Sequence, residues 1–342
     1  MKASDKTMLP KGGMLLEVKN LKTYFHSDSG SVMAVDDVSF HVRQGETLGI
    51  VGESGCGKSV SCMSILRLVE TPPGKYEGGQ ILFDGEDLLR VSDSRMRQIR
   101  GNEISFIFQE PMTSLNPVFK IGDQIGEVLV LHQGMSQKEA HAHAVEMLRT
   151  VRIPNPERVV NDYPFALSGG MRQRAMIAMA LACRPKLLIA DEPTTALDVT
   201  IQAQVLDLMN KLKDETGASI IFITHDLGVI AEMSDRVMVM YAGKVAEVAS
   251  VRDIFKNPKH PYTIGLIGSR PDMETTADRL VVIPGNVPDL NNRPSGCPFH
   301  PRCPDAMPQC SQDFPPETRL DDGTGEEHKV FCWRYVKGGE IK

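Results

Sequence analysis

Apolar residues recur along the chain with two different spacings, which together predict a mixed α/β protein. Short apolar runs bounded by turn residues predict strands at 15–19, 38–42, 48–51, 81–83, 104–108, 187–190, 219–223 and 236–240. Apolar residues three and four positions apart predict a helix after residue 58, ended by Pro72 and Pro73, and helical structure over 123–152. Within that stretch, Ser136 and Glu139 form a capping-box pattern that starts a second helix. Strands separated by helices imply a parallel sheet covered on both faces.

The pattern changes along the chain and predicts three regions. Residues 1–13 are polar and form a flexible N-terminus, and residues 14–255 form the main α/β domain with a helical insertion at about 111–167. A loop is expected at 26–31, between the first two strands. After about residue 257, prolines and glycines multiply and leave little room for regular structure. Residues 256–342 are therefore expected to form a separate C-terminal module.

Composition and charge narrow the class of protein. The chain has 342 residues, of which 41% are hydrophobic and 24% charged, as in ordinary globular proteins. No apolar run reaches the roughly 18 residues that a membrane-spanning helix needs, and the N-terminus lacks the apolar middle of a signal peptide. A cytoplasmic location is expected. The net charge of −6 argues against a nucleic-acid partner.

The segment Gly-Glu-Ser-Gly-Cys-Gly-Lys-Ser, from Gly52 to Ser59, is a complete phosphate-binding loop between a predicted strand and a predicted helix. Its glycines let backbone N–H groups point toward phosphates, Lys58 reaches the β and γ phosphates, and Ser59 ligates Mg²⁺. The nucleotide-binding candidates here are Gly52, Ser54, Gly55, Cys56, Gly57, Lys58, Ser59 and Val60. The chain is therefore expected to bind a nucleoside triphosphate.

An acidic pair follows the apolar strand at 187–190. Asp191 is placed to hold Mg²⁺, and Glu192 can orient or deprotonate an attacking water molecule. Many parallel strands end in an aspartate, so the pair gains its meaning from the phosphate-binding loop that precedes it in the chain.

The segment Ser168-Gly169-Gly170-Met171-Arg172-Gln173 resembles the signature of ATP-binding-cassette (ABC) ATPases. The resemblance covers about 15–250. It implies a P-loop α/β fold with a mostly parallel sheet core, an antiparallel β subdomain and a helical subdomain, to which the small Cys/Pro-rich module is added. The remaining family elements are matched by Phe25 as the adenine-stacking aromatic (with Tyr24 as an alternative), Gln109, the segment Ala196-Leu197-Asp198, and His225.

The same resemblance implies roles for these residues. Ser168 and the amides of Gly169 and Gly170 clamp the γ-phosphate of an ATP held by an opposing subunit. The implied catalytic residues are Glu192, His225, Gln109 and Lys58, and the implied Mg²⁺ site consists of Ser59, Gln109 and Asp191. The implied ATP contacts beyond the loop are Phe25, Gln109, Ser168, Gly169, Gly170, Asp198 and His225.

Four of the seven cysteines, Cys297, Cys303, Cys310 and Cys332, lie in the last fifth of the chain. Four thiolates in a proline-rich loop suit either a [4Fe–4S] cluster or tetrahedral zinc, and free thiols remain an alternative. The surrounding sequence, with His260-Pro-Tyr-Thr and Gly296-Cys-Pro-Phe-His-Pro-Arg-Cys-Pro, resembles the tail of ATPase subunits from oligopeptide and dipeptide importers. That resemblance favours the cluster.

The resemblance to peptide importers implies the function and the partners. The chain is expected to hydrolyse ATP at the cytoplasmic face of the membrane and to power uptake of short peptides. The implied partners are a second, related ATPase, two transmembrane permease subunits that contact the helical insertion near Gln109, and an extracytoplasmic solute-binding protein. Importers of nickel, glutathione and some oligosaccharides share these features. A soluble ABC ATPase is disfavoured because the chain has one cassette and no long coiled coil.

Overall fold

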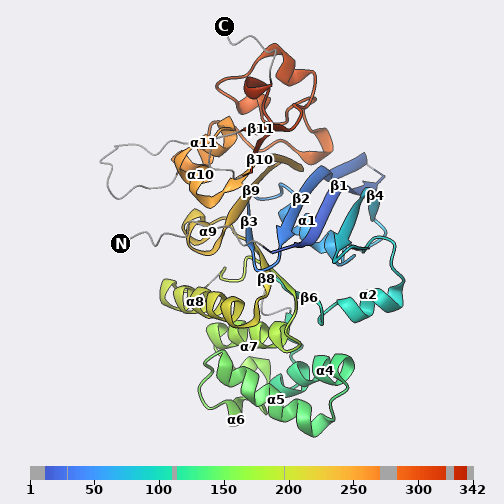
Figure 1. The fold of residues 1–342 in the computed structure, drawn as a ribbon, viewed down its shortest axis with the longest axis vertical. Coiled ribbons are helices and arrows are strands. Elements are labelled where there is room, and N and C mark those ends of the chain that lie inside the picture. The colour runs from blue at the N-terminus through green and yellow to red at the C-terminus, as the bar shows by residue number, and fades with distance from the viewer. Residues whose placement is uncertain are drawn as a thin grey trace. The chain divides into compact units, whose positions relative to one another are not determined.

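The computed structural model describes residues 12–28, 30–109, 114–195, 197–269, 283–320 and 327–336 (Figure 1). These residues form two compact units, each built from separate stretches of sequence. The first unit contains residues 12–13, 43–46 and 90–223, and the second contains the described parts of 14–42, 47–89 and 224–336. The second unit thus combines the phosphate-binding loop with the C-terminal residues. The predicted division at residue 256 stays a prediction.

Three parallel strands form the sheet of the first unit. These are β6 (Ile104–Ile107), β7 (Leu187–Asp191) and β8 (Ser219–Ile223), with β7 in the middle. Every residue of β7 and β8 is buried, which explains why both strands are almost entirely apolar. All three predicted strands are confirmed.

Helices make up the rest of the first unit, and α4, α5 and α7 pack against one another, drawn in green in Figure 1. The predicted capping box at Ser136 and Glu139 is present, so the predicted helical stretch divides into α4 and α5. The helices are α2 (Asp93–Ile99), α4 (Ile121–Gln133), α5 (Gln137–Thr150), α6 (Pro156–Val159), η1 (Pro164–Ala166), α7 (Gly169–Leu181) and α8 (Val199–Thr216).

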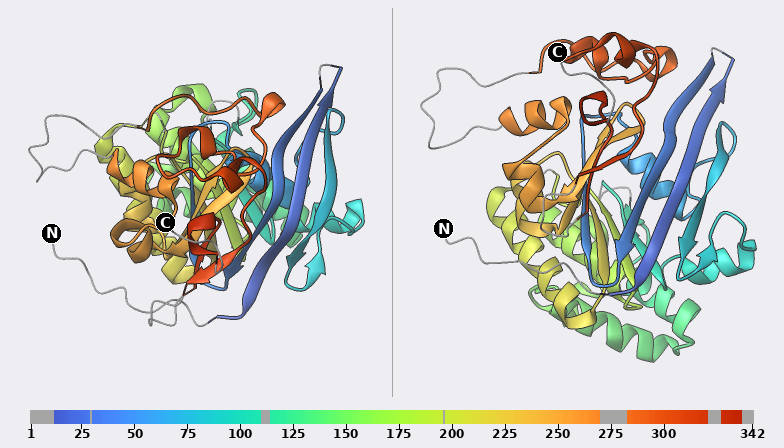
Figure 2. Two further views of the ribbon diagram at one scale, coloured as in Figure 1. Left: turned by 90° about the horizontal axis from the view of Figure 1, so that it is seen from above. Right: turned by 45° about the horizontal axis from the view of Figure 1, so that its top comes forward.

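The second unit contains a four-stranded sheet in the order β2-β1-β4-β5. Its strands are β1 (Met14–Ser27), β2 (Gly30–Arg43), β4 (Gly74–Phe83) and β5 (Glu86–Asp87), and β1 and β2 lie side by side as long ribbons in Figure 2. Both ribbons extend into the loop predicted at 26–31. β1 pairs with β4 as far as Phe25, opposite Gly74. Backbone pairing thus continues where the apolar alternation has ended.

A second sheet of this unit joins β3 (Thr47–Val51) in parallel to β9 (Arg236–Tyr241) and continues with antiparallel strands. These are β10 (Lys244–Ser250), β12 (His328–Val330) and β11 (Thr318–Leu320). The C-terminal residues therefore contribute two strands, although their proline content predicted little regular structure. The pairing of β12 with β10, with Val330 opposite Glu247, explains the difference, because a partner strand supplies the hydrogen bonds.

The helix after the phosphate-binding loop is shorter than predicted. α1 (Lys58–Ile65) ends at the C-cap residue Leu66, and Arg67 has a φ of 51° that no α-helix permits, so Pro72 and Pro73 do not end it. The other helices of the unit are α9 (Leu227–Met233), α10 (Val251–Lys256), α11 (Pro261–Gly268), η2 (Leu290–Asn292), η3 (His300–Arg302), η4 (Pro308–Ser311) and η5 (Trp333–Tyr335).

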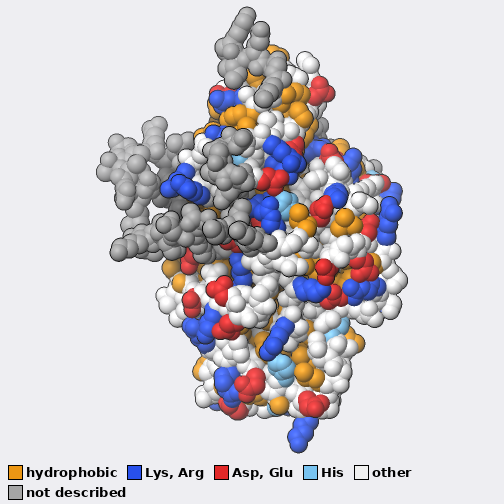
Figure 3. Space-filling view, in the orientation of Figure 1, with side chains coloured by type: hydrophobic (Ala, Val, Ile, Leu, Met, Phe, Trp, Pro, Cys, Tyr) orange, Lys and Arg blue, Asp and Glu red, His pale blue; other side chains and the backbone are white. Residues whose placement is uncertain are grey.

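Acidic and basic side chains are interspersed over the face drawn in Figure 3, where the described residues form no wide area of a single sign. No helix in the described part of the chain is both long and apolar enough to cross a bilayer.

Candidate nucleotide site

The phosphate-binding loop of the second unit has a backbone that requires glycine. Gly52 and Gly57 have φ values of 153° and 97°. A Cβ atom would lie 2.2 Å from the Met240 carbonyl oxygen at Gly52 and 2.2 Å from the Ala34 carbonyl oxygen at Gly57. Gly57 is also the N-cap of α1 and offers its first turn no side-chain acceptor. The amides at this helix start are therefore suited to bind an anion.

Lys58 lies inside the loop, and its side chain is buried. Its ammonium group donates to the carbonyl oxygens of Gly52, at 2.8 Å, and of Glu53, at 3.1 Å. Cys56 is fully buried, and burial raises the pKa of its thiol, so its side chain is core packing and only its backbone can face a ligand. Ser54 and Gly55 are exposed at the tip of the loop.

The two aromatic candidates for stacking on adenine have different surroundings. The Tyr24 hydroxyl donates to Asp36 at 2.8 Å, and burial together with this hydrogen bond raises the pKa of Tyr24 to about 12. Phe25 follows on the opposite face of β1, where its ring lies near Gly74. Because Tyr24 is committed to Asp36, Phe25 stays the candidate.

His225 is exposed at the start of the segment that leads into α9. Its neighbours fix the backbone, since the Asp226 N–H donates to the Thr224 hydroxyl at 3.0 Å and the Asp226 carboxylate caps α9 through the Gly228 N–H at 2.7 Å. The histidine is thus held between an ordered turn and a helix cap.

In the first unit, the acidic pair lies at the end of a strand as predicted, with Asp191 as the last residue of β7 and Glu192 directly after it. Asp191 is 5% exposed, and Glu192 has a left-handed backbone with a φ of 47°. One carboxylate oxygen of Glu192 accepts from the Gln109 amide at 3.1 Å and from the Thr195 hydroxyl at 2.9 Å. The structure therefore brings together two residues that are 83 positions apart in the sequence. The predicted Mg²⁺ site, which adds Ser59 of the second unit, stays a prediction.

The signature segment forms the N-terminus of α7. Ser168 is the N-cap, its hydroxyl accepts from the Met171 N–H at 3.4 Å, and both Ser168 and Gly169 are exposed. Gly170 lies against the first turn of α8, because a Cβ there would be 3.0 Å from Ile201. Asp198 caps α8 through the Ile201 N–H at 2.9 Å, so two helix starts adjoin here. Ala196 and residues 110–113 lie outside the described residues.

The four C-terminal cysteines line one small hollow of about 10 Å³, together with His260, His300 and Asp305. Burial raises the pKa of Cys297 to about 12 and that of Cys303 to about 11. The four cysteines that are clustered in the sequence therefore also lie around one hollow in the structure. Across the described ranges, however, no three His, Cys, Asp or Glu side chains are arranged to hold a metal ion, so this geometry does not support the predicted iron–sulfur cluster.

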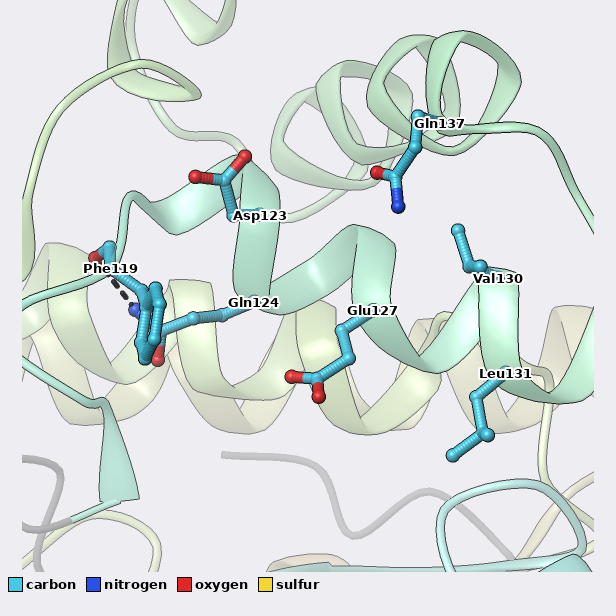
Figure 4. Close-up of a pocket in the computed structure, with 7 residues that line it drawn as sticks. All are labelled: Phe119, Asp123, Gln124, Glu127, Val130, Leu131 and Gln137. Atoms are coloured by element: carbon cyan, nitrogen blue, oxygen red, sulfur yellow. Dashed lines mark hydrogen bonds between the residues drawn. The ribbon is translucent and has the colours of Figure 1, made fainter.

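Another hollow, of about 510 Å³, lies on α4 and the start of α5 in the first unit (Figure 4). It is lined by Phe119, Asp123, Gln124, Glu127, Val130, Leu131 and Gln137. Phe119 and Leu131 are 53% and 72% exposed, which is unusual for large apolar side chains. The Gln124 amide donates to the Phe119 carbonyl oxygen at 3.0 Å and so fixes the segment before α4.

Sequence reasoning missed the residues that surround Glu53, the second residue of the phosphate-binding loop. Arg302 donates to both of its carboxylate oxygens, at 2.8 and 3.2 Å, and the Tyr262 hydroxyl accepts from its N–H at 2.9 Å. Tyr262 and Arg302 lie 209 and 249 positions away from Glu53 in the sequence. No local pattern signals such a contact, although an arginine between proline-rich turns that is only 9% exposed requires a partner.

Comparisons with known proteins agree with these observations. Residues 35–195 match the family described as ABC transporter, and residues 246–310 match the family described as oligopeptide/dipeptide transporter, C-terminal region. The oligopeptide transport ATP-binding protein AppD of Bacillus subtilis is 55% identical over 325 residues, which cover 95% of this chain and 98% of that protein. The chain belongs to the ABC transporter ATP-binding proteins.

Other relatives and solved structures support this membership. The dipeptide transport ATP-binding protein DppD of Bacillus subtilis is 52% identical, over 93% of this chain and 94% of that protein. A probable peptide ABC transporter ATP-binding protein of Sinorhizobium fredii, y4tR, is 53% identical, with coverages of 95% and 96%. The cassette MJ0796, in a dimeric post-hydrolysis state with ADP and phosphate, has a TM-score of 0.63 and 29% identity, with coverages of 70% and 99%. This ABC protein is therefore an ATPase with the ABC fold.

Proposed function

We propose that this ABC ATPase powers the import of dipeptides and oligopeptides from the cytoplasmic face of the cell membrane. The observation that carries the proposal is the match of residues 246–310 to the C-terminal region of oligopeptide/dipeptide transporters. Relatives more than 50% identical over nearly their whole length are named for peptide transport, which supports the same substrate class.

The site residues have different proposed roles in ATP hydrolysis. The loop amides and Lys58 bind the phosphates of ATP, while Ser59, Asp191 and Gln109 hold Mg²⁺, which neutralises phosphate charge. Glu192 takes the proton of the attacking water, and His225 contacts the γ-phosphate. The hydrogen bond from Gln109 to Glu192 supports this division, because the glutamine then senses the charge and position of the base.

The signature segment acts on a second cassette. Ser168 and the amides of Gly169 and Gly170 form an exposed helix N-terminus, which suits a γ-phosphate supplied from outside the chain. We infer that the second cassette is a related chain, and that Asp198 adjoins the same interface because α7 and α8 start side by side. The dimeric structure of MJ0796 supports pairing of cassettes.

The hollow on α4 is proposed to receive cytoplasmic segments of the permease subunits, of which two are expected. An extracytoplasmic solute-binding protein is proposed to deliver peptide to these permeases. Exposed Phe119 and Leu131 provide apolar contacts there, and Asp123 and Glu127 on α4 add negative charge that would attract a basic segment (Figure 4).

Reconstitution with the permeases and the binding protein tests the function. We expect ATP-dependent accumulation of labelled di- and tripeptides inside proteoliposomes, and no accumulation when the ATPase carries Glu192→Gln. Nickel, glutathione and an oligosaccharide serve as competing cargoes. Uptake of one of these without any peptide uptake would contradict the peptide assignment and leave the ATPase assignment intact.

We propose in addition that Cys297, Cys303, Cys310 and Cys332 hold a structural [4Fe–4S] cluster, with zinc as the alternative. The four cysteines line one hollow without being arranged around a metal ion, so the proposal requires that a bound cluster would draw the sulfurs together and deprotonate them. Iron and sulfide analysis of anaerobically purified protein should give four of each per chain. Stoichiometric zinc without sulfide would overturn the cluster, and the absence of both metals would overturn any metal site.

A further inference from the structure

Glu53 is held through all three of its polar groups. Its N–H donates to the Tyr262 hydroxyl at 2.9 Å, its carbonyl oxygen accepts from Lys58 at 3.1 Å, and its carboxylate receives two hydrogen bonds from Arg302. Glu53 follows Gly52 directly, so its position and that of the phosphate-binding loop are fixed together. Both Tyr262 and Arg302 lie outside the residues matched to the ABC transporter family model, which end at 195.

Arg302 is itself rigidly placed. Its guanidinium also donates to the Tyr241 hydroxyl at 3.1 Å and to the carbonyl oxygens of Pro284 and Ile283, at 2.9 and 3.3 Å. A buried arginine with this many partners keeps a single orientation, because any rotation leaves a desolvated donor without an acceptor. The C-terminal segment therefore presents a fixed positive charge to the loop.

The charge matters because a carboxylate in a phosphate-binding loop opposes the binding of a polyphosphate. The pairing with Arg302 neutralises Glu53, and its bidentate geometry sets where the carboxylate lies. Without Arg302, the carboxylate would remain charged next to the loop and would be free to move.

We propose that Arg302 is a positioning residue for ATP binding: it acts through Glu53 to neutralise the phosphate-binding loop and to fix its backbone. The C-terminal segment that contains Arg302 is then a functional part of the nucleotide site. The inference rests on the ATP-binding role that is proposed above for the phosphate-binding loop.

The test compares two arginines of the same C-terminal segment. Arg302→Met removes the contact with the loop, and Arg293→Met serves as the matched control, because Arg293 anchors the segment to Asp36 instead. In the full chain, we expect Arg302→Met to raise the KM for ATP and the Kd of a fluorescent ATP analogue about tenfold, with a much smaller change in kcat. Arg302→Lys keeps the positive charge but cannot donate two parallel hydrogen bonds to the carboxylate, so it should give an intermediate KM. Equal KM values for Arg302→Met and Arg293→Met would mean that Arg302 only docks the segment.

A double variant identifies the route of the effect. Adding Glu53→Gln to Arg302→Met removes the uncompensated carboxylate, so we expect the KM to return most of the way to the wild-type value. Additive losses would overturn the proposal, because Arg302 would then act independently of Glu53. Should Arg302→Met fail to fold, Arg302→Lys and the double variant, which has no unpaired charge, provide the same comparison. A normal KM in every variant, with wild-type ATPase activity present, would sink this inference and leave the proposed function standing.

Discussion

Glu192 has a left-handed backbone, with a φ of 47°, that few residues other than glycine, asparagine and aspartate adopt. Its N–H donates to the Ile223 carbonyl oxygen at 2.9 Å, and its carboxylate binds Gln109 and Thr195. Such backbone conformations cost about 1–3 kcal/mol and persist where the surroundings hold them. In this conformation the carboxylate lies beside Gln109 and Thr195, within hydrogen-bonding distance of both.

At this scale we expect Glu192→Gln to bind ATP with nearly wild-type affinity and to lower kcat by about 10²- to 10⁴-fold, because the amide cannot accept a proton. Steady-state ATPase assays and binding of a fluorescent ATP analogue measure the two effects. Glu232→Gln, at an exposed position of α9, is the control and should leave both unchanged. Undiminished turnover in Glu192→Gln would remove Glu192 as the catalytic base.

At the scale of elements, a buried charge network joins strands of both sheets in the second unit to the C-terminal segment. Asp36 of β2 accepts hydrogen bonds from Tyr24 of β1 and from Arg293, and it pairs with Lys244 of β10 at 2.9 Å. Burial opposes ionisation of Asp36, but the hydrogen bonds from Arg293, Lys244 and Tyr24 outweigh it and lower its pKa from 3.8 to about 2. The carboxylate therefore stabilises the folded state.

Asp36→Asn should lower the free energy of unfolding at pH 7 by about 3 kcal/mol, because it leaves two cations without their buried partner. Since the folded pKa is depressed, this stabilisation is complete above pH 3.8 and is lost as the pH falls toward 2. The difference between the wild type and the variant in urea unfolding should therefore shrink in that window. Asp37→Asn, at the neighbouring exposed position, should change stability by less than about 0.5 kcal/mol. Equal losses for the two variants would contradict the role of the network.

At the scale of the whole molecule, the chain carries a phosphate-binding loop in one unit and a signature helix start in the other. Under the proposed function, the exposed amides at Ser168 complete the pocket of a partner cassette. A chain whose phosphate-binding loop is inactivated should therefore still supply its signature segment to the partner, and the reverse should also hold.

Dimers of this chain with itself, formed in the absence of the related chain, test this exchange when chains that carry Lys58→Ala are mixed with chains that carry Ser168→Arg. Each variant alone should be inactive. In a mixed dimer both defects fall in one pocket and the other pocket is intact, so about a quarter of wild-type ATPase activity should return if the subunits pair at random and head to tail. A mixture that is as inactive as its components, although cross-linking detects mixed dimers, would show that Ser168 serves the ATP bound to its own chain.

The sequence by itself determined the elements and residues whose cause is local. The alternation of apolar runs located β6, β7 and β8, the Ser136–Glu139 pattern located the start of α5, and the glycine spacing located a loop whose backbone excludes other residues. These features depend on residues within a few positions of one another. The sequence could not place the end of α1 or the full length of β1, because capping geometry and strand pairing decide those.

Only the tertiary structure decided which distant residues meet. The hydrogen bond of Gln109 to Glu192 spans 83 positions, the pair of Arg302 and Glu53 spans 249, and four cysteines separated by up to 35 residues line one hollow. Contacts of this kind arise from the packing of whole elements and leave no periodic trace in the chain. The residue types indicated the chemistry, and the fold brought the guanidinium of Arg302 to the Glu53 carboxylate of the phosphate-binding loop.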